Sequence, residues 1–193
     1  MQLSTPFNPS PPANQEAEMV PDIDQLAMAH GRAVFSAAYR VTGNIAQAED
    51  VQQNVFVRLL EKPPRSQVDN WAAYLGAMAT RAAIDELRRG TRWQRLADTF
   101  LASRKSPEAM PSEALDEATR ANHLRQALGR IPKRQAECFA MRFFDGMDLD
   151  AIAQALGVTP NVVSVSLNRA THSLRSRIKS IESSTTEPLE NRS

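Results

Sequence analysis

The sequence predicts an all-α protein in which two small helical domains are joined by a flexible linker. Apolar residues recur every three or four positions through most of the chain, and nothing in its first half alternates with the period of two typical of strands. Segments rich in Pro and Ser interrupt this helical pattern. The expected division is a disordered segment at 1–21, helical domains at 22–95 and 118–181, a linker at 96–117 and a disordered tail at 182–193.

The first domain should contain three helices. The first ends at a turn over residues 42–44, and the second spans roughly residues 45–61. The third spans about 71–89, with Asp69 or Asn70 as its N-cap. The apolar residues expected to face the core are Leu26, Ala29, Val34, Ala37 and Ala38 in the first helix, Val51, Val55, Leu59 and Leu60 in the second, and Trp71, Leu75, Met78, Ala82 and Leu87 in the third.

The second domain should end in a helix-turn-helix at residues 146–175. Gly157 can adopt the positive φ of a tight turn, while Thr159 and Pro160 suit the N-cap and first position of the next helix. Such a unit can place its second helix in a DNA groove, although an ordinary helical hairpin in a core has the same pattern. The apolar seam between the two helices is expected to comprise Ile152, Leu156, Val158, Val163 and Leu167.

Charge is nearly balanced over the whole chain, so its distribution is more informative than its total. The net charge is only +1. Basic side chains are concentrated along and after the third helix, where acidic side chains are fewer. These basic residues are Arg81, Arg88, Arg89, Arg92, Arg95, Arg104 and Lys105.

The sequence contains no pattern typical of catalysis or of metal or cofactor binding. His30, His123 and His172 lie far apart, and no nucleophile stands beside a base. The single cysteine, Cys138, cannot form an internal disulfide, which fits a reducing compartment. No apolar run approaches the ~20 residues that span a bilayer, and no signal peptide is recognisable. We therefore expect a cytoplasmic protein that is not an enzyme, needs no cofactor and does not insert into membranes.

Both predicted domains contain segments that resemble one protein family. Residues 48–59 (AEDVQQNVFVRL), 71–75 (WAAYL) and 83–89 (AIDELRR) are similar to regions 2.2, 2.3 and 2.4 of extracytoplasmic-function (ECF) sigma factors of the sigma-70 family. Residues 128–135 (LGRIPKRQ) are similar to the opening of region 4, and residues 146–175 to region 4.2. Two matches in this order are more specific than either alone, and the chain has no room for the middle domain of larger sigma factors.

The resemblance implies that the first domain binds core RNA polymerase through its second helix and faces the promoter −10 element with its third. An arginine stripe can contact DNA phosphates regardless of sequence. The expected polymerase-binding residues are Glu49, Asp50, Gln53, Asn54, Phe56 and Arg58, with Asn54 where the family often has an acid. The expected −10 residues are Lys62, Arg65, Asn70, Arg81, Arg88, Arg89 and Arg92.

The resemblance also implies that the second domain contacts the promoter −35 element. Asn161 and Asn168 can pair with adenine, whereas Ser164 and Ser166 stand where many family members carry Lys and Arg. The expected −35 residues are Thr159, Asn161, Ser164, Val165, Ser166, Asn168, Arg169, His172 and Arg175.

The leading hypothesis is thus a dissociable transcription-initiation subunit whose partners are core RNA polymerase, promoter DNA and, by family resemblance, an anti-sigma factor. One alternative is a stand-alone helix-turn-helix regulator, which leaves the first domain unexplained. A second is a sigma-like adaptor with weakened promoter recognition, suggested by Asn54, Ser164 and Ser166.

Overall fold

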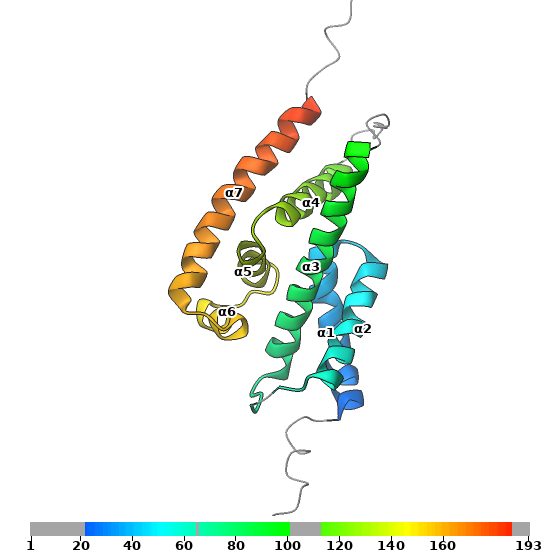
Figure 1. Cartoon of the computed structure of the whole chain (residues 1–193), viewed down its shortest axis with the longest axis vertical. Helices are drawn as coiled ribbons and strands as arrows, with labels where there is room; N and C mark the ends of the chain where they lie inside the picture. Colours follow the sequence, from blue (N-terminus) through cyan, green and yellow to red (C-terminus); the bar gives the residue numbers. More distant parts are fainter. Residues whose placement is uncertain (1–21, 65, 101–112, 187–193) are drawn as a thin grey trace, which may run out of the picture.

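The computed structural model describes the backbone of residues 22–64, 66–100 and 113–186, and all regular structure in these ranges is helical. The all-α prediction is confirmed. Figure 1 shows α1, α2 and α3 on one side of the molecule and α5, α6 and α7 on the other. The helices are α1 (Ile23–Thr42), α2 (Ile45–Glu61), α3 (Trp71–Phe100), α4 (Glu113–Arg130), α5 (Lys133–Phe143), α6 (Leu149–Leu156) and α7 (Pro160–Thr186).

Local signals place the ends of the first helices as expected. Gly43 ends α1 in the left-handed conformation, with φ of 65°, and its amide donates to the Tyr39 carbonyl. The Asn44 side chain then caps α2 by accepting from the Gln47 amide at 3.0 Å. Of the two candidate caps for α3, Asn70 takes the role, because its Oδ1 accepts from the Ala73 amide at 3.0 Å.

Helix α3 is longer than the periodicity predicts. It continues past the expected end at residue 89 to Phe100, and α4 begins at Glu113, so helix occupies both ends of the predicted linker. Residues 90–100 contain no proline and several good helix formers, and nothing in them stops the helix. At ~1.5 Å per residue, the 30 residues of α3 extend over about 45 Å, enough to contact both domains.

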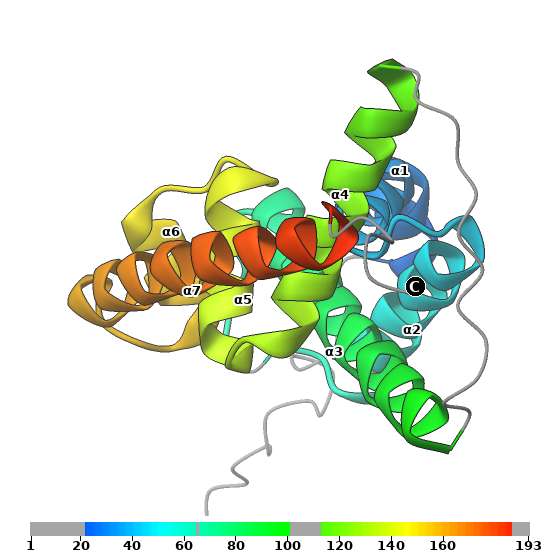
Figure 2. The same ribbon diagram turned by 90° about the horizontal axis from the view of Figure 1, so that it is seen from above.

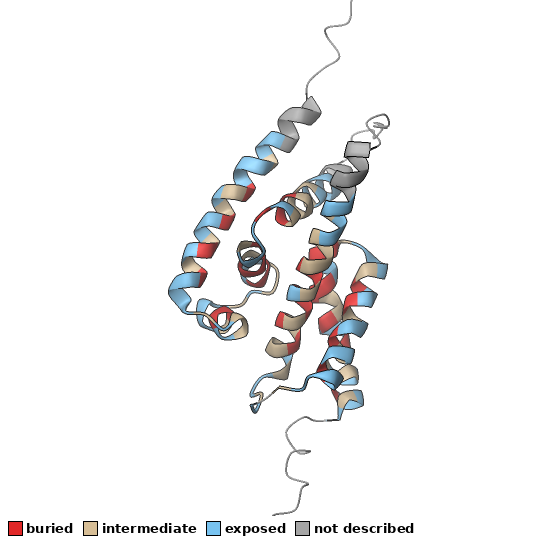
Figure 3. Cartoon of the chain, in the orientation of Figure 1, coloured by how far each residue is buried: buried red, intermediate tan, exposed pale blue. Residues whose placement is uncertain are grey.

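Both domains contribute to one buried cluster. Val34 from α1 and Leu59 from α2 belong to the same cluster as Leu128 from α4 and Leu174 from α7. Helix α3 lies between the two groups of helices, and its buried residues lie in its first half, between Leu75 and Ile84 (Figure 3). Ala29 is an exception to the expected core, because it is exposed on α1.

The helix-turn-helix forms as predicted. Asp148 caps α6 by accepting from the Ala151 amide at 2.7 Å, and Gly157 makes the turn with φ of 63°. Ile152 and Val163 are buried in a second cluster, which Ala77 of α3 also joins. Seen from above in Figure 2, α7 passes across α5 and α6. The remaining seam residues, Leu156, Val158 and Leu167, are half-buried against this cluster.

Candidate protein and nucleic-acid interfaces

Helix α2 presents a face of acids and amides to solvent. Glu49, Asp50, Gln53 and Asn54 are all exposed, as is Arg58, so the structure brings these five predicted residues together on one helix. The sixth, Phe56, is half-buried and packs against the core. It therefore supports the position of α2 more than it contributes to the exposed face.

Two large apolar side chains lie among these polar groups. Val57 is 49% exposed and Leu60 64% exposed, so the expectation that Leu60 faces the core was wrong. The buried stripe of α2 is complete without it, since Val51, Val55 and Leu59 already follow the spacing of three or four. Leu60 lies one position, or about 100°, beyond Leu59 on the helix. The same spacing places Val57 off the buried stripe, although Val57 is not among the residues predicted for the polymerase contact.

The loop before α3 is only partly available for other contacts. Lys62 is exposed, whereas the carboxamide oxygen of Asn70 is used in the N-cap of α3. Arg65 lies outside the described residues. Trp71 and Tyr74 contact each other edge-to-face, with ring centroids 5.8 Å apart, and both pack against the buried cluster.

Most of the predicted arginine stripe on α3 is engaged within the molecule. Arg88 donates through Nη1 to the backbone carbonyl of Ile131, and Arg81 Nε lies 3.8 Å from Glu137 Oε1. Both of these partners belong to the second domain. Arg89 pairs with Glu86 on its own helix, and Arg92 is exposed.

Exposed side chains of α7 form the candidate recognition surface. Asn161, Val165, Asn168 and His172 recur at spacings of four, three and four, which places them on one side of the helix. Val165 is 40% exposed, so its methyl groups are available between the two carboxamides. Around these residues, Thr159, Arg169 and Arg175 are exposed and Ser164 is half-buried.

Ser166 does not belong to this surface, which corrects the prediction. It is 9% exposed, and its hydroxyl donates to the Val162 carbonyl at 2.7 Å. Position 166 follows the buried Val163 by three residues and precedes the buried Ala170 by four, so it lies on the core side of α7. Burial raises the pKa of the neighbouring Cys138 thiol, and the Ser166 side chain offsets this effect only in part.

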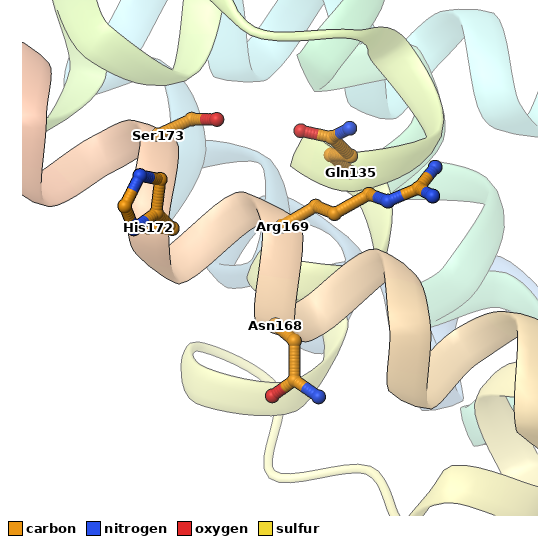
Figure 4. A pocket seen from close by; sticks show the side chains of 5 residues that line it. All are labelled: Gln135, Asn168, Arg169, His172 and Ser173. Atoms are coloured by element: carbon orange, nitrogen blue, oxygen red, sulfur yellow. The ribbon is translucent and has the colours of Figure 1, made fainter.

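An open hollow of about 400 Å³ borders the recognition surface between α5 and α7. It is lined by Gln135, Asn168, Arg169, His172 and Ser173 (Figure 4). Gln135 comes from α5, and its buried Oε1 has no hydrogen-bond partner. No local pattern in the sequence marks Gln135 as a contact residue, because its relation to α7 depends on how α5 and α7 pack.

Within the described part of the chain, no group of His, Cys, Asp and Glu side chains is arranged to hold a metal ion. No described helix is both long and apolar enough to cross a membrane. Three surfaces stand out in the described structure: the polar and apolar face of α2, the arginines of α3 and the exposed side of α7.

Comparison with known proteins matches both domains. A family model described as Sigma-70 region 2 matches residues 26–94, and one described as Sigma-70, region 4 matches residues 122–171. The ECF RNA polymerase sigma factor SigE of Mycolicibacterium smegmatis is 25% identical over 166 residues, covering 84% of this chain and 64% of that protein. This chain thus spans less than two thirds of that relative. SigW of Bacillus subtilis is 20% identical over 161 residues, covering 77% and 84%.

A solved structure has the same fold. It is the sigma factor RpoE in complex with the anti-sigma factor NepR from Bartonella quintana, which aligns with a TM-score of 0.51 at 19% identity. The alignment covers 83% of this chain and 98% of that one. The two family models match in the order region 2, region 4, and together they cover more than half of the 193 residues. The chain belongs to the sigma-70 family, in its extracytoplasmic-function group.

Proposed function

We propose that this protein is a sigma factor that binds core RNA polymerase and directs it to promoters by contacting the −10 and −35 elements. The observation that carries the proposal is the occurrence of region 2 and region 4 in order in one chain. Its role would be to choose the promoter and assist strand opening, while the polymerase performs the catalysis. It would act in the cytoplasm with the polymerase.

The polymerase contact is assigned to the exposed face of α2. Val57 and Leu60 provide apolar anchors, and the acidic Glu49 and Asp50 favour a basic partner surface. An interface of this kind buries apolar side chains at its centre and keeps charged groups near its rim. Leu60 and Val57 are thus central contacts in the proposal, although neither belongs to the polar set predicted from sequence.

The −35 contact is assigned to the exposed side of α7. Asn161 and Asn168 have the donor and acceptor pair that matches adenine, and Val165 can contact the methyl group of thymine. Arg169 and Arg175 would hold the DNA backbone. Buried Ser166 has no part in this contact, so a missing cation at that position is no argument for weakened promoter recognition.

The direct test is reconstitution with purified core polymerase and fragmented DNA from the source genome, followed by mapping of transcript 5′ ends. We expect protein-dependent starts preceded by shared, spaced −35 and −10 sequences. Val57→Ala with Leu60→Ala should abolish these starts by weakening polymerase binding. A stable complex with core polymerase that yields no dependent starts would favour the adaptor alternative.

We also propose that an anti-sigma factor binds this protein. The fold relative from Bartonella quintana was solved with one, NepR. Affinity purification of the tagged full chain from its own cells, followed by mass spectrometry, should recover a protein that blocks the reconstituted transcription. Recovery of polymerase subunits alone, under inducing and non-inducing conditions, would contradict this partner.

A further inference from the structure

We propose that Trp93 is a stacking site for an unpaired base of single-stranded DNA, with Arg89 and Arg92 binding the phosphates beside that base. The site lies on α3 beyond the buried part of the helix. The inference rests on the proposed function, because a protein that assists strand opening meets unpaired bases. It adds a residue that holds the opened strand without reading its sequence.

Trp93 is unusually exposed for so large an aromatic side chain. It is 72% exposed, the highest fraction among the aromatic side chains that the structure describes. The other tryptophan, Trp71, is half-buried against the core. Leaving an indole in water forgoes the free energy that burial of its apolar surface would provide. A ligand that covers the ring would recover that free energy.

Packing of α3 against α4 determines which way Trp93 points. Thr91 faces α4, because a side chain on Gly129 of that helix would collide with the Thr91 hydroxyl. The same hydroxyl donates to the Leu87 carbonyl on its own helix at 2.9 Å. At about 100° per residue, Trp93 lies about 200° around the helix from Thr91. The indole therefore projects from the side of α3 that faces away from α4, where it is accessible in the free protein.

Two exposed arginines flank the indole. Arg89 lies one turn before Trp93, within about 40° of it on the helix, and Arg92 is its neighbour in sequence. Arg89 pairs with Glu86, but its side chain remains 65% exposed, and exposed ion pairs contribute little. Gly90 lies three residues before Trp93 with open space around it, so no side chain at that position shields the ring.

This combination fits single-stranded nucleic acid better than a protein partner. Aromatic side chains stack on bases of any sequence, while cationic side chains bind the backbone phosphates. Residues 87–96 include four arginines and no acid. The centre of a protein interface is mainly apolar, whereas the neighbours of Trp93 on its side of α3 are Arg89 and Gly90. Bases in a duplex are covered on both faces, so the indole can stack only where a strand is open.

The first measurement uses the free full-length protein with Trp71→Phe, which leaves Trp93 as its only tryptophan. The ligands are a short oligothymidylate and a strand of equal length in which every base is missing, so both carry the same phosphates. We expect the oligothymidylate to quench the fluorescence of Trp93 and the abasic strand to leave it unquenched. Protein with Trp93→Phe, which retains Trp71, should show no base-dependent quenching.

The second measurement compares affinities for labelled oligothymidylate in protein that retains Trp71. Trp93→Ala and Trp93→Leu should each weaken binding at least about fivefold, the lower end of the range for removal of one stacking aromatic. Trp93→Phe should keep most of the affinity, because it keeps an aromatic face. The slope of log K against log salt should stay unchanged in all three variants, because none removes a charge. Circular dichroism should confirm that each variant remains helical.

The arginines should give the opposite result. Arg89→Gln with Arg92→Gln should make the salt slope shallower by about 1.4 units, since each phosphate contact to a single strand contributes ~0.7. The quenching of bound Trp93 should persist in this variant. Arg32→Gln with Arg120→Gln removes two exposed arginines elsewhere and should leave the slope at its wild-type value.

Equal quenching of Trp93 by the two strands would overturn the proposal. So would a Trp93→Leu variant that binds oligothymidylate as tightly as wild type, because stacking requires an aromatic face. If Trp93→Ala weakens binding to core polymerase and leaves oligonucleotide binding unchanged, the residue belongs to a protein interface and the proposal is wrong. The oligonucleotide measurements involve no polymerase. Base-dependent binding by a protein that supports no transcript starts would leave the stacking site in place and refute the proposed function.

Discussion

At the scale of single residues, Val165 provides a chemical test of base recognition. It lies exposed between Asn161 and Asn168 on the outer side of α7. An aliphatic side chain in that position can distinguish thymine only through the methyl group at C5. The proposed contact can therefore be removed by changing either the base or residue 165.

We predict that replacing thymine by deoxyuridine in the −35 element weakens wild-type holoenzyme binding about fourfold, since a buried methyl contributes ~0.8 kcal/mol. The Val165→Ala holoenzyme should bind both DNAs equally, because the partner of the methyl group is gone. Competition binding measures both effects. Equal sensitivity of wild type and variant to the base change would show that Val165 does not contact thymine.

Glu137 is a second residue with a measurable signature. It is buried on α5, with Arg81 and Lys133 each 3.8 Å away, and its Oε1 has no hydrogen-bond partner. Burial raises the pKa of this carboxyl above its ordinary 4.5, and the nearby cations only partly offset that effect. The folded protein therefore binds this proton more tightly than the unfolded chain does.

Protonated Glu137 therefore stabilises the folded state below pH 4.5. This contribution to the free energy of unfolding is lost as pH rises through the raised pKa of the folded state. We predict that Glu137→Gln increases the free energy of unfolding at neutral pH and has no such effect below pH 4.5. Denaturant unfolding across this range measures the difference. Exposed Glu61→Gln on α2 controls for the loss of one charge. The same pH-dependent gain in the Glu61 variant would rule out burial as the cause.

At the scale of elements, substitutions at two glycines test two local constraints: the left-handed turn between α6 and α7, and the interior of helix α3. Gly157 has φ of 63° between α6 and α7, with open space around it, so a side chain there meets strain without a clash. Gly90 also has open space around it, but it lies inside helix α3. One substitution should therefore have opposite effects at the two positions.

We predict that Gly157→Ala lowers the free energy of unfolding by about 1–2 kcal/mol, the cost of the left-handed conformation. Gly90→Ala should raise it by roughly 0.5–1 kcal/mol, because alanine favours a helix interior. Thermal and denaturant unfolding measure both changes. A destabilising Gly90→Ala would contradict the continuous α3 helix through this position.

The elements also indicate why helix boundaries were harder to predict than helix faces. The caps of α1, α2 and α3 are formed by residues within three or four positions, so the sequence already contains them. The predicted end of α3 at residue 89 is not an end in the structure, and the helix continues through Gly90 into the predicted linker. Ser166 was expected to be exposed and Leu60 to be buried, and the structure shows the reverse. Each residue adjoins a correctly predicted apolar stripe and was assigned to the wrong side of the edge of that stripe.

At the scale of the whole molecule, the packing of the second domain against α3 gives Arg88 a contact besides its proposed one with DNA. Arg88 contacts the second domain in the free protein, and in the proposed complex it contacts DNA. Arg89 pairs only locally, with Glu86, among the described contacts. Removal of both side chains should leave the exposed face of α2 unchanged.

We predict that Arg88→Ala with Arg89→Ala reduces promoter-directed transcription while core polymerase binding stays intact. The salt dependence of promoter binding by the holoenzyme should become shallower by about 1.4–1.8 units, as expected for two lost phosphate contacts. Arg32→Ala with Arg120→Ala removes two exposed arginines elsewhere and serves as the control. Unchanged transcription from the Arg88 and Arg89 variant would exclude this face of α3 from promoter contact.

The sequence by itself determined the helical class, the helix-turn-helix with its apolar seam, and the two sigma-70 segments. These features depend on periodicity, caps and turn residues that act over a few positions. Only the tertiary structure decided which charged groups are available, because their partners lie far apart in the chain. Arg40 and Asp145 are separated by 105 positions and Asp85 and Lys133 by 48, and no local pattern encodes such pairs. Packing of α5 against α3 places Lys133 beside Asp85 and gives Arg81 and Arg88 partners in the second domain, while Arg89 and Arg92 stay exposed.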